Sequence, residues 1–314
     1  MVNSLVLLAG SSHPELAKKI SAYIGVPVAD MDLFKFANDD NFVKINENIR
    51  QRNVYVIQST CRPVNDNLME LLIVMDACKR ASTNSITAVL PYYGYARSDK
   101  KDQPRVPITA KLVADLLTTA GADRIICMDL HAEAIQGFFN IPVDHLYAMP
   151  VFIEYLKQRL LRDLVIVSPD AGGVARARAY AKRVGADLAI VDKRRVGNQD
   201  ATEMYHVIGE VRGKSCVLVD DIIDTAGTIT KAAGILLDRG AREVRAMGTH
   251  ATLSEPARER LQSSDLVEVL VTDTVPIPQE KMIPKIRVLS IAPLLGETIK
   301  RIHDGDSVSS LFIK

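Results

Sequence analysis

The chain has 314 residues, 47% hydrophobic and 25% charged, so it can bury one large core or two ordinary ones, and two domains are expected. Its 39 basic and 38 acidic residues leave a net charge of +1, which excludes a global field that attracts nucleic acid or an anionic membrane. Four cysteines without metal-ligand spacing, and an N-terminal apolar run too short to span a bilayer, indicate a cytoplasmic protein.

Short apolar runs alternate with amphipathic stretches along the whole chain. Runs that are apolar on both faces are typical of parallel strands covered by helices, so the expected class is α/β. The first helix is expected to begin with a capping box made by Ser12 and Glu15. Two polar segments, residues 97–106 and 194–203, are expected to be mobile loops. The expected strands are residues 4–8, 54–58, 85–90, 124–128, 164–168, 187–191, 215–219, 243–248 and 267–271.

Residues 116–132 and 235–251 form an internal repeat. The two segments align without gaps, and the alignment brings His131 onto His250. Each copy reads as a helix, a glycine turn, a strand and a histidine. Because solenoid repeats recur about every 20 to 50 residues, this longer period predicts two copies of one domain. We expect an N-terminal domain over residues 1–148 and a C-terminal domain over residues 149–314.

The segment VLVDDIIDTAGTI, residues 217–229, carries the strongest chemical signal. A buried strand leads to two adjacent carboxylates, Asp220 and Asp221, which suit the vicinal hydroxyls of a sugar or a bound cation. A strand-to-helix turn of small and hydroxyl residues suits a phosphate, which the helix dipole also favours. A phosphorylated ribose satisfies both halves, whereas the alternative is a well-capped turn with exposed acids. The turn residues are Asp224, Thr225, Ala226, Gly227 and Thr228.

Two further strand ends and one basic segment are candidates for the same chemistry. His131 follows a buried strand at the sheet edge where open α/β sheets bind ligands, although a lone histidine is more often structural. Asp170, in SPDAGG, has the same placement, with a helix N-cap as its alternative. Lys193, Arg194 and Arg195 could balance charge on phosphoryl oxygens, or form a solvated basic strand end.

These motifs are similar in order and spacing to those of ribose-phosphate diphosphokinases. VLVDDIIDTAGT resembles the phosphoribosyl-binding loop that this family shares with type I phosphoribosyltransferases. The likeness runs from residue 10 to the C-terminal SVSSLF, and one-domain phosphoribosyltransferases lack the first half. It implies the phosphate-dependent class, built of two tandem type I phosphoribosyltransferase-like domains, each a mostly parallel sheet flanked by helices. The other matching segments are GSSHPELAKKI, PYYGYARSDKK, ITAKLVADLL, MDLHAEAIQGFF, SPDAGGVARA and VDKRR.

The resemblance implies an enzyme that uses Mg²⁺ to transfer the β,γ-diphosphoryl group of ATP to the 1-hydroxyl of ribose 5-phosphate. The products are phosphoribosyl diphosphate, a precursor in nucleotide biosynthesis, and AMP. His131 and Asp170 correspond to Mg²⁺ ligands, Lys193 to a catalytic residue, and Arg195 to a catalytic residue that also contacts substrate. Asp220 and Asp221 correspond to the residues that bind the ribose hydroxyls, and residues 224–228 to those that bind the 5-phosphate.

The expected ATP site departs from the family pattern. Arg97 matches an ATP-contacting arginine, but Ser98 stands where a glutamine is usual. A Phe-Ser-Asp-Gly-Glu-like segment typically reaches the adenine of a neighbouring subunit. Here Phe36 is kept for stacking, whereas an aspartate restricts the backbone at the glycine position and the final acid is one methylene shorter. We therefore expect altered adenine affinity or nucleotide preference. The segment reads Phe36, Ala37, Asn38, Asp39 and Asp40.

The resemblance also implies homo-oligomers, often hexamers, with phosphate activation and ADP inhibition at a subunit interface. Two alternatives stay open: a phosphoribosyltransferase, which consumes the expected product, and a catalytically silent regulatory subunit, which the departure at residues 38–40 favours. The matching effector positions are Arg50, Ser82, Arg105, Gln136, Asp144, Ser307, Ser309 and Phe312.

Overall fold

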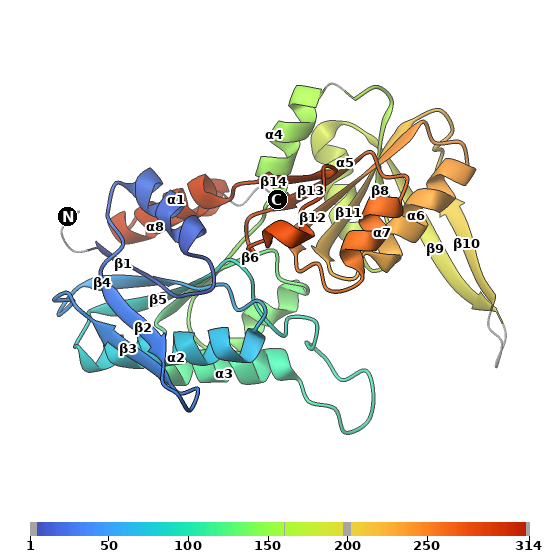
Figure 1. Ribbon diagram of the computed structural model, residues 1–314. Coiled ribbons are helices and arrows are strands. Elements are labelled where there is room, and N and C mark those ends of the chain that lie inside the picture. Colours follow the sequence, from blue (N-terminus) through green and yellow to red (C-terminus); the bar gives the residue numbers. More distant parts are fainter. Residues whose placement is uncertain (1–4, 160, 197–201, 312–314) are drawn as a thin grey trace. The chain divides into compact units, whose positions relative to one another are not determined.

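The computed structural model describes residues 5–159, 161–196 and 202–311, and of residues 193–196 and 202–204 it describes the backbone alone (Figure 1). The chain divides into two compact units, each with its own sheet. Unit 1 runs to Tyr147 and also includes Thr274–Pro276 and the segment from Ile291 onward. Unit 2 comprises Ala148–Asp273 and Ile277–Ser290. None of the helices in the described part of the chain is long and apolar enough to cross a bilayer.

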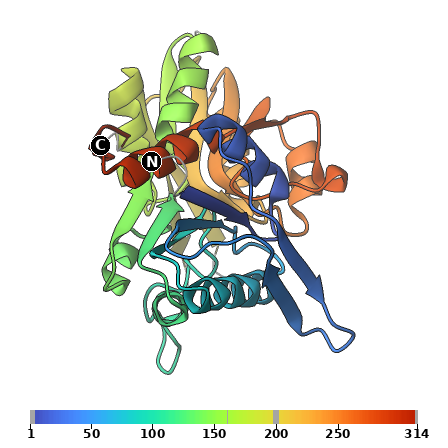
Figure 2. The ribbon, with the colours of Figure 1, turned by 90° about the vertical axis from the view of Figure 1, so that its left-hand side faces the viewer.

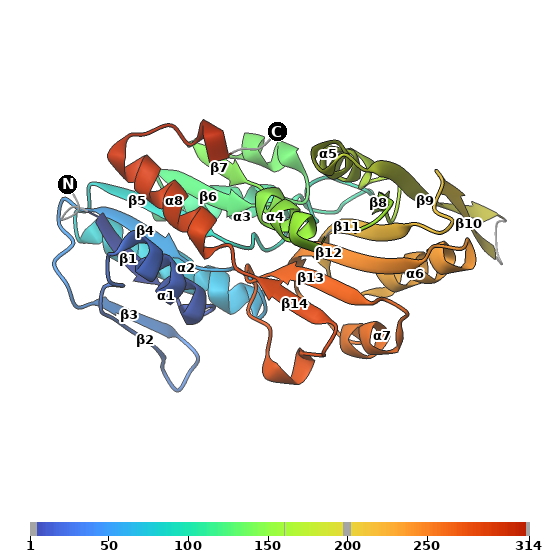
Figure 3. The same cartoon turned by 90° about the horizontal axis from the view of Figure 1, so that it is seen from above.

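The C-terminal segment corrects the expected domain division. The first boundary falls where it was expected, but residues 291–311 belong to unit 1 and not to the second domain. The reason is the packing of α8 (Ala292–Asp304) beside α1 (Pro14–Ile24), which the figures show side by side (Figures 1 and 3). Leu295 and Ile299 of α8 are fully buried.

Unit 1 is built on a five-stranded sheet in the order β1-β4-β5-β6-β7, with every pair parallel. Helices α2 (Val64–Arg80) and α3 (Thr109–Ala120) cover one face, and α1 and α8 cover the other (Figure 2). A short 3₁₀ helix, η2 (Glu133–Phe138), follows β6, and another, η4 (Ser309–Leu311), follows α8. The strands are β1 (Leu5–Ala9), β4 (Asn53–Ile57), β5 (Ser85–Leu90), β6 (Arg124–Met128) and β7 (Val143–Leu146).

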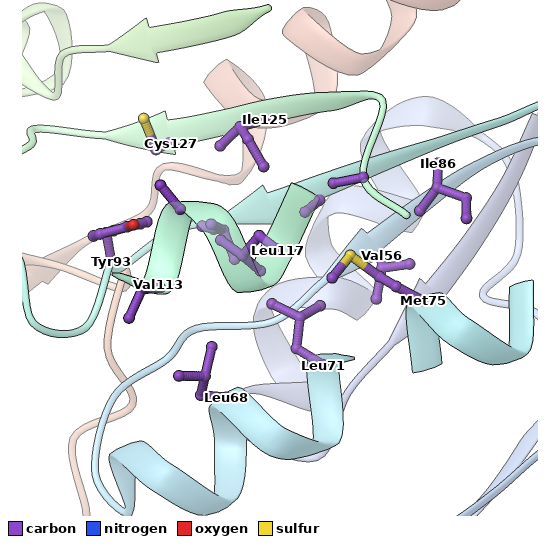
Figure 4. Close-up of a cluster of buried hydrophobic side chains, with 14 of the residues drawn as sticks. Val56, Leu68, Leu71, Met75, Ile86, Tyr93, Val113, Leu117, Ile125 and Cys127 are labelled. Atoms are coloured by element: carbon purple, nitrogen blue, oxygen red, sulfur yellow. The ribbon is translucent and has the colours of Figure 1, made fainter. Parts of the chain in front are cut away.

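The core of unit 1 lies between this sheet and the α2–α3 pair (Figure 4). Leu71 and Met75 of α2 and Leu117 of α3 meet Val56 and Ile86 of the strands, and all five are buried. Outside the main sheet, β2 (Met31–Lys35) and β3 (Asn41–Ile45) form an antiparallel hairpin that packs on α2. One hairpin face therefore contacts the core while the other faces solvent.

Unit 2 is built on a seven-stranded sheet in the order β10-β9-β8-β11-β12-β13-β14, in which the β10–β9 pair alone is antiparallel. Helices α4 and α5 pack together over one face, and α6 and α7 over the other (Figure 3). The strands are β8 (Leu164–Ser168), β9 (Asp187–Val196), β10 (Thr202–Ile208), β11 (Ser215–Ile223), β12 (Glu243–Ala251), β13 (Glu268–Thr272) and β14 (Ile286–Leu289). The helices are α4 (Met149–Arg159), α5 (Val174–Val184), α6 (Gly227–Asp238), α7 (Ala257–Ser263) and the 3₁₀ turn η3 (Gln279–Lys281).

The expected α/β class and all nine expected strands are confirmed. The repeat is confirmed as well, because α3 and α6 are each followed by a glycine with positive φ, Gly121 and Gly240, before β6 and β12. The expected capping box is wrong. His13 caps α1 through Nδ1, which accepts from the Leu16 N–H at 3.4 Å, while the Ser12 hydroxyl instead donates to Gln58 at 2.6 Å.

Candidate active site

Two adjacent carboxylates lie near the carboxyl end of β11, next to an arginine of α5. Arg176 Nη1 is 3.1 Å from Asp221 Oδ1 and 3.7 Å from Asp220 Oδ1. The Asp221 side chain is 5% exposed, whereas that of Asp220 is 27% exposed. The Asp221 N–H also donates to Asp220 Oδ1 at 2.9 Å. Arg176 therefore offsets the charge of a pair of acids that would otherwise repel each other in a half-buried strand end.

The Asp220 carboxyl ionises less readily than an ordinary aspartate, because its pKa is raised. Burial, and then the hydrogen bond and charge of Asp221, raise the pKa of Asp220 to about 7, while Arg176 opposes the rise. An ionised carboxylate accepts hydrogen bonds from hydroxyls more strongly than a protonated one. Near neutral pH, Asp220 is thus present in two forms. The protonated carboxyl donates a hydrogen bond, and the ionised carboxylate accepts hydrogen bonds from hydroxyl groups.

The turn after β11 is short and partly exposed. Ala226, its last residue, has a left-handed backbone with φ 59, and α6 begins at the next residue. Thr225 and Thr228 are exposed, and α6 has neither an acid in its first turn nor a side-chain cap. A left-handed residue before a helix turns successive backbone N–H groups toward one point, which is a common way to bind an anion. The turn is therefore suited to a phosphate.

A cavity of about 370 Å³ in unit 2 opens beside this turn. Its lining includes Thr225, Gly227 and Thr228 of residues 224–228, the segment that we call the phosphate turn. It also includes Asp170 and two exposed cations, Lys231 of α6 and Arg260 of α7. Arg260 Nη1 donates to the Thr225 carbonyl at 3.1 Å, so the guanidinium lies directly against the turn. The lining residues are Pro169, Asp170, Val191, Tyr205, Thr225, Gly227, Thr228, Lys231, Ala232 and Arg260.

Asp170 follows β8 and is exposed. One carboxylate oxygen, Oδ1, accepts from the Gly173 N–H at 2.9 Å and closes the turn before α5, but the N-cap of α5 is Gly173, so the helix N-cap alternative for Asp170 is wrong. Gly173 fits close to Ser168, whose hydroxyl would lie 2.8 Å from an added Cβ. An exposed carboxylate at a strand end suits Mg²⁺, which binds few protein ligands and keeps several waters.

His131 and its repeat mate are placed very differently. His131 lies beyond β6 in unit 1 and is exposed, whereas His250 lies inside β12 and is 2% exposed. The loop before His131 is held by His145, whose Nε2 accepts from the Leu130 N–H at 2.9 Å. Within the described part of the chain, no three His, Cys, Asp or Glu side chains gather as a metal cluster. His131 thus has the exposure that a metal ligand needs, and His250 the burial of a structural residue.

The expected loop at residues 194–203 is wrong in part. Lys193, Arg194 and Arg195 lie within β9, which pairs antiparallel with β10, so that Lys193 is opposite Tyr205. Strand β9 extends to Val196 because the segment TEMYHVI pairs along it as β10. The side chains of Lys193 and Arg195 lie outside the described residues. The other expected loop, residues 97–106, contains neither helix nor strand.

The expected ATP residues belong to unit 1. Phe36 and Asn38–Asp40 form the turn of the β2–β3 hairpin, where Asp39 adopts φ 68, the left-handed conformation that glycine favours. The turn closes nonetheless, because the Phe36 N–H donates to Asp40 O at 2.9 Å. Arg97 is exposed. Ser98 caps α3, since its hydroxyl accepts from the Thr109 N–H at 3.4 Å.

The described effector positions also belong to unit 1. Asp144 is 8% exposed and pairs with Arg124 Nη1 at 2.6 Å, so its carboxylate has a structural partner. Phe312 lies outside the described residues. The remaining positions, all exposed or half-buried, are Arg50, Ser82, Arg105, Gln136, Ser307 and Ser309.

Arg176 and Arg260 were missed from the sequence. Each arginine lies far along the chain from its partner. Arg176 is in α5 and its partner Asp221 is in β11, whereas Arg260 is in α7 and its partner Thr225 is in the turn before α6. The position of Arg176 six residues after Asp170, in the first turn of α5, was the one available signal. Nothing in the sequence near Arg260 pointed to the phosphate turn.

Comparisons with known proteins show to which family the chain belongs. Residues 5–121 match the family model described as the N-terminal domain of ribose phosphate pyrophosphokinase, and residues 198–313 match the phosphoribosyl synthetase-associated domain. The chain belongs to the ribose-phosphate pyrophosphokinase family. Enzymes of this family use ATP and ribose 5-phosphate as substrates.

Full-length relatives support the assignment. The chain is 54% identical over 309 residues to the ribose-phosphate pyrophosphokinase of Gloeobacter violaceus, covering 98% of this chain and 93% of the relative. It is 52% identical to a chloroplastic one of Arabidopsis thaliana, covering 98% and 77%. The solved phosphoribosylpyrophosphate synthetase of Mycobacterium smegmatis is 45% identical, with a TM-score of 0.92 over 96% of this chain and 99% of that one. The α/β fold of the family is thereby confirmed for both units.

Proposed function

We propose that the ribose 1-hydroxyl attacks the β-phosphorus of ATP in line with the bond that joins the α- and β-phosphates. A new bond forms between the sugar oxygen and the β-phosphorus, the bridging bond to the α-phosphate breaks, AMP leaves, and the hydroxyl proton is released. The products are phosphoribosyl diphosphate and AMP. The turn at residues 220–228 is the observation that carries this proposal, because it joins a diol acceptor to an anion site within a few residues.

Ribose 5-phosphate binds to unit 2 in this proposal. Asp220 and Asp221 accept hydrogen bonds from the ribose hydroxyls, and residues Asp224, Thr225, Ala226, Gly227 and Thr228 hold the 5-phosphate. The positive charge of Arg176 opposes the rise in the pKa of Asp220, which favours the ionised carboxylate and so hydroxyl binding. Arg260 holds the turn through its hydrogen bond to the Thr225 carbonyl. Catalysis is then mainly a matter of orientation, because two reactants held in line react as one.

Mg²⁺ is the expected cofactor, with His131 and Asp170 as its protein ligands. When bound, Mg²⁺ would neutralise charge on the phosphate oxygens of ATP. Lys193, Arg195 and Arg97 supply further positive charge around the transferred group, and Arg195 also contacts the sugar phosphate. Phe36 stacks on adenine, and Asn38, Asp39, Asp40 and Ser98 complete the nucleotide site.

Regulation and location follow the same proposal. Phosphate activates and ADP inhibits through the positions Arg50, Ser82, Arg105, Gln136, Asp144, Ser307, Ser309 and Phe312, in a homo-oligomer, most simply a hexamer. A cytoplasmic location agrees with four cysteines that are all buried and free. Sedimentation with and without phosphate tests the oligomer, which should change its size or its activity with phosphate.

One incubation separates this function from its rivals. The chain is mixed with ATP, ribose 5-phosphate and Mg²⁺, and ³¹P NMR follows the products. We expect AMP to appear in step with phosphoribosyl diphosphate. Turnover only with phosphoribosyl diphosphate and a nucleobase would support a phosphoribosyltransferase. Turnover only after a second subunit is added would support a regulatory chain.

A further inference from the structure

The outward face of the β2–β3 hairpin carries three aromatic rings. Phe34 and Phe42 are cross-strand neighbours whose rings stack at 4.6 Å between centroids with an interplanar angle of 27°. Phe36 lies two residues beyond Phe34 and meets both rings edge to face, at 5.3 Å and 5.6 Å. The three rings therefore form one aromatic cluster at the end of the hairpin.

Folding does not account for this cluster. Phe34 is 50% exposed and Phe36 49% exposed, so much of their apolar area stays in water, where it contributes little to stability. The hairpin is anchored by its other face, where Leu33 and Val43 pack against the unit 1 core and Lys35 pairs with Asp66 of α2 at 3.1 Å. The outward rings are thus free to serve a ligand.

The hairpin also holds these rings in fixed places. The Asn38 side chain donates to Asp40 Oδ2 at 2.7 Å, and the Asp39 N–H donates to Phe36 O at 2.9 Å, so the turn next to Phe36 is closed on itself. Edge-to-face and stacked contacts restrict how each ring can rotate. A ring that is already held loses less entropy when a flat ligand stacks on it.

We propose that Phe34 and Phe42 are positioning residues that hold Phe36 in place for stacking on the purine of ATP. This inference rests on the proposed function, in which Phe36 stacks on adenine. Phe34 and Phe42 form the support, and Phe36 presents its ring to the base. The device favours bicyclic purine nucleotides over pyrimidine nucleotides, because the larger ring gains more from a stacking partner that is fixed.

Leucine and tyrosine substitutions at the support positions test this. Phe34→Leu and Phe42→Leu keep apolar bulk but remove the ring, so KM for ATP should rise about fivefold. At saturating ATP, kcat should hold, and KM for ribose 5-phosphate should stay within twofold. Phe34→Tyr and Phe42→Tyr should restore KM for ATP. The parent should prefer ATP to CTP, and the leucine variants should lose most of that preference.

Leu112→Ala is the matched control, because Leu112 is an exposed apolar side chain of α3, 55% exposed and in the same unit. It should leave both KM values unchanged. The inference is overturned if the leucine variants keep the parent KM for ATP, or if tyrosine fails to restore it. It is also overturned if KM for ribose 5-phosphate and the melting temperature change in parallel with KM for ATP, since that indicates a structural role.

ATP binding by calorimetry separates this inference from the proposed function. If the parent gives no phosphoribosyl diphosphate, the proposed function fails. The affinity for ATP still reports on the rings in that case. Weaker ATP binding in Phe34→Leu, restored in Phe34→Tyr, supports the inference, and equal binding in all three overturns it.

Discussion

The equivalent strand ends of the two units have matching strand neighbours but carry different side chains: tyrosines in unit 1 and aspartates in unit 2. Thr87 of β5 pairs with Arg124, and Ser215 of β11 pairs with Glu243, the repeat mate of Arg124. By this register, Tyr92 and Tyr93 of unit 1 occupy the positions of Asp220 and Asp221 in unit 2. Tyr93 is 2% exposed, and its hydroxyl donates to Ala110 O at 2.8 Å.

The connections that follow differ as well. In unit 2 residues 224–226 alone separate β11 from α6, Thr225 of the turn is exposed, and Asp220 is partly exposed. In unit 1 the connection to α3 is residues 91–108, and the Tyr93 ring lies 6.1 Å from that of Phe139, inside the core. The buried tyrosine at this strand end therefore stabilises unit 1, whereas in the proposed function the strand end of unit 2 binds ribose 5-phosphate. Mutations at matching positions should separate these two uses.

The largest effect is expected at the acids of unit 2. Replacing both Asp220 and Asp221 by Asn should lower kcat/KM for ribose 5-phosphate about 100-fold, because two charge-assisted hydrogen bonds are lost. The matched change in unit 1, Tyr92→Phe, should leave kcat/KM within twofold. Steady-state kinetics with both substrates varied measures this. An Asn–Asn variant with parental kinetics would refute the assigned role of the acids.

At Tyr93 of unit 1, substitutions are expected to lower stability and to leave activity unchanged. Tyr93→Leu should lower the free energy of unfolding by about 2 kcal/mol, because it leaves a cavity in the core of unit 1 and removes a buried hydrogen bond. Tyr93→Phe should cost about 1 kcal/mol. Urea unfolding gives both values. If kcat per folded molecule falls more than threefold in Tyr93→Phe, the strand end of unit 1 also serves catalysis.

A smaller, pH-dependent effect is expected from the raised pKa of Asp220. Because the carboxylate binds hydroxyls best when ionised, affinity for ribose 5-phosphate should fall as the pH drops through about 7. Asp220→Asn should remove that part of the dependence, while the sugar phosphate's own ionisation affects both proteins alike. Calorimetric titrations from pH 5.5 to 8.5 test this. Parallel curves for the two proteins would contradict it.

At Asp220, a rise in pH should lower the stability of the fold, although it should raise the affinity for ribose 5-phosphate. The folded state holds the Asp220 proton to a higher pH than the unfolded state, so its contribution is present below the unfolded pKa and is lost as the pH rises toward 7. Above pH 7, Asp220→Asn should therefore be more stable than the parent, by about 1 kcal/mol, and this gain should vanish near pH 4. A gain that does not depend on pH would point to another cause.

The smallest effect is expected at Ala226. Ala226→Gly removes the steric cost of a left-handed alanine, partly offset by the greater freedom of glycine in the unfolded chain, for a net gain of about 0.5 kcal/mol. Affinity for ribose 5-phosphate should stay within twofold. Thermal unfolding measures the gain. A loss of stability would show that the turn does not need positive φ at this residue.

Features that depend on a continuous stretch of sequence could be predicted, whereas contacts between distant segments could not. Nine strands were predictable because their runs are apolar on both faces. The strands β2, β3, β7, β10 and β14 were not, since they are half-exposed or carry polar residues such as Asp144 and His145. The acids and the phosphate turn were visible because they are contiguous in sequence. Arg176 and Arg260 were not, because only packing brings α5 and α7 onto the turn.

The most direct test of the diol and phosphate site compares two sugars on two proteins. Calorimetry gives the affinity of the parent and of Asp221→Asn for ribose 5-phosphate and for 2-deoxyribose 5-phosphate. We expect the parent to prefer ribose 5-phosphate about tenfold, and the Asn variant to bind both sugars within twofold of each other. An unchanged preference in Asp221→Asn would show that the sugar hydroxyls bind elsewhere, and would contradict the account.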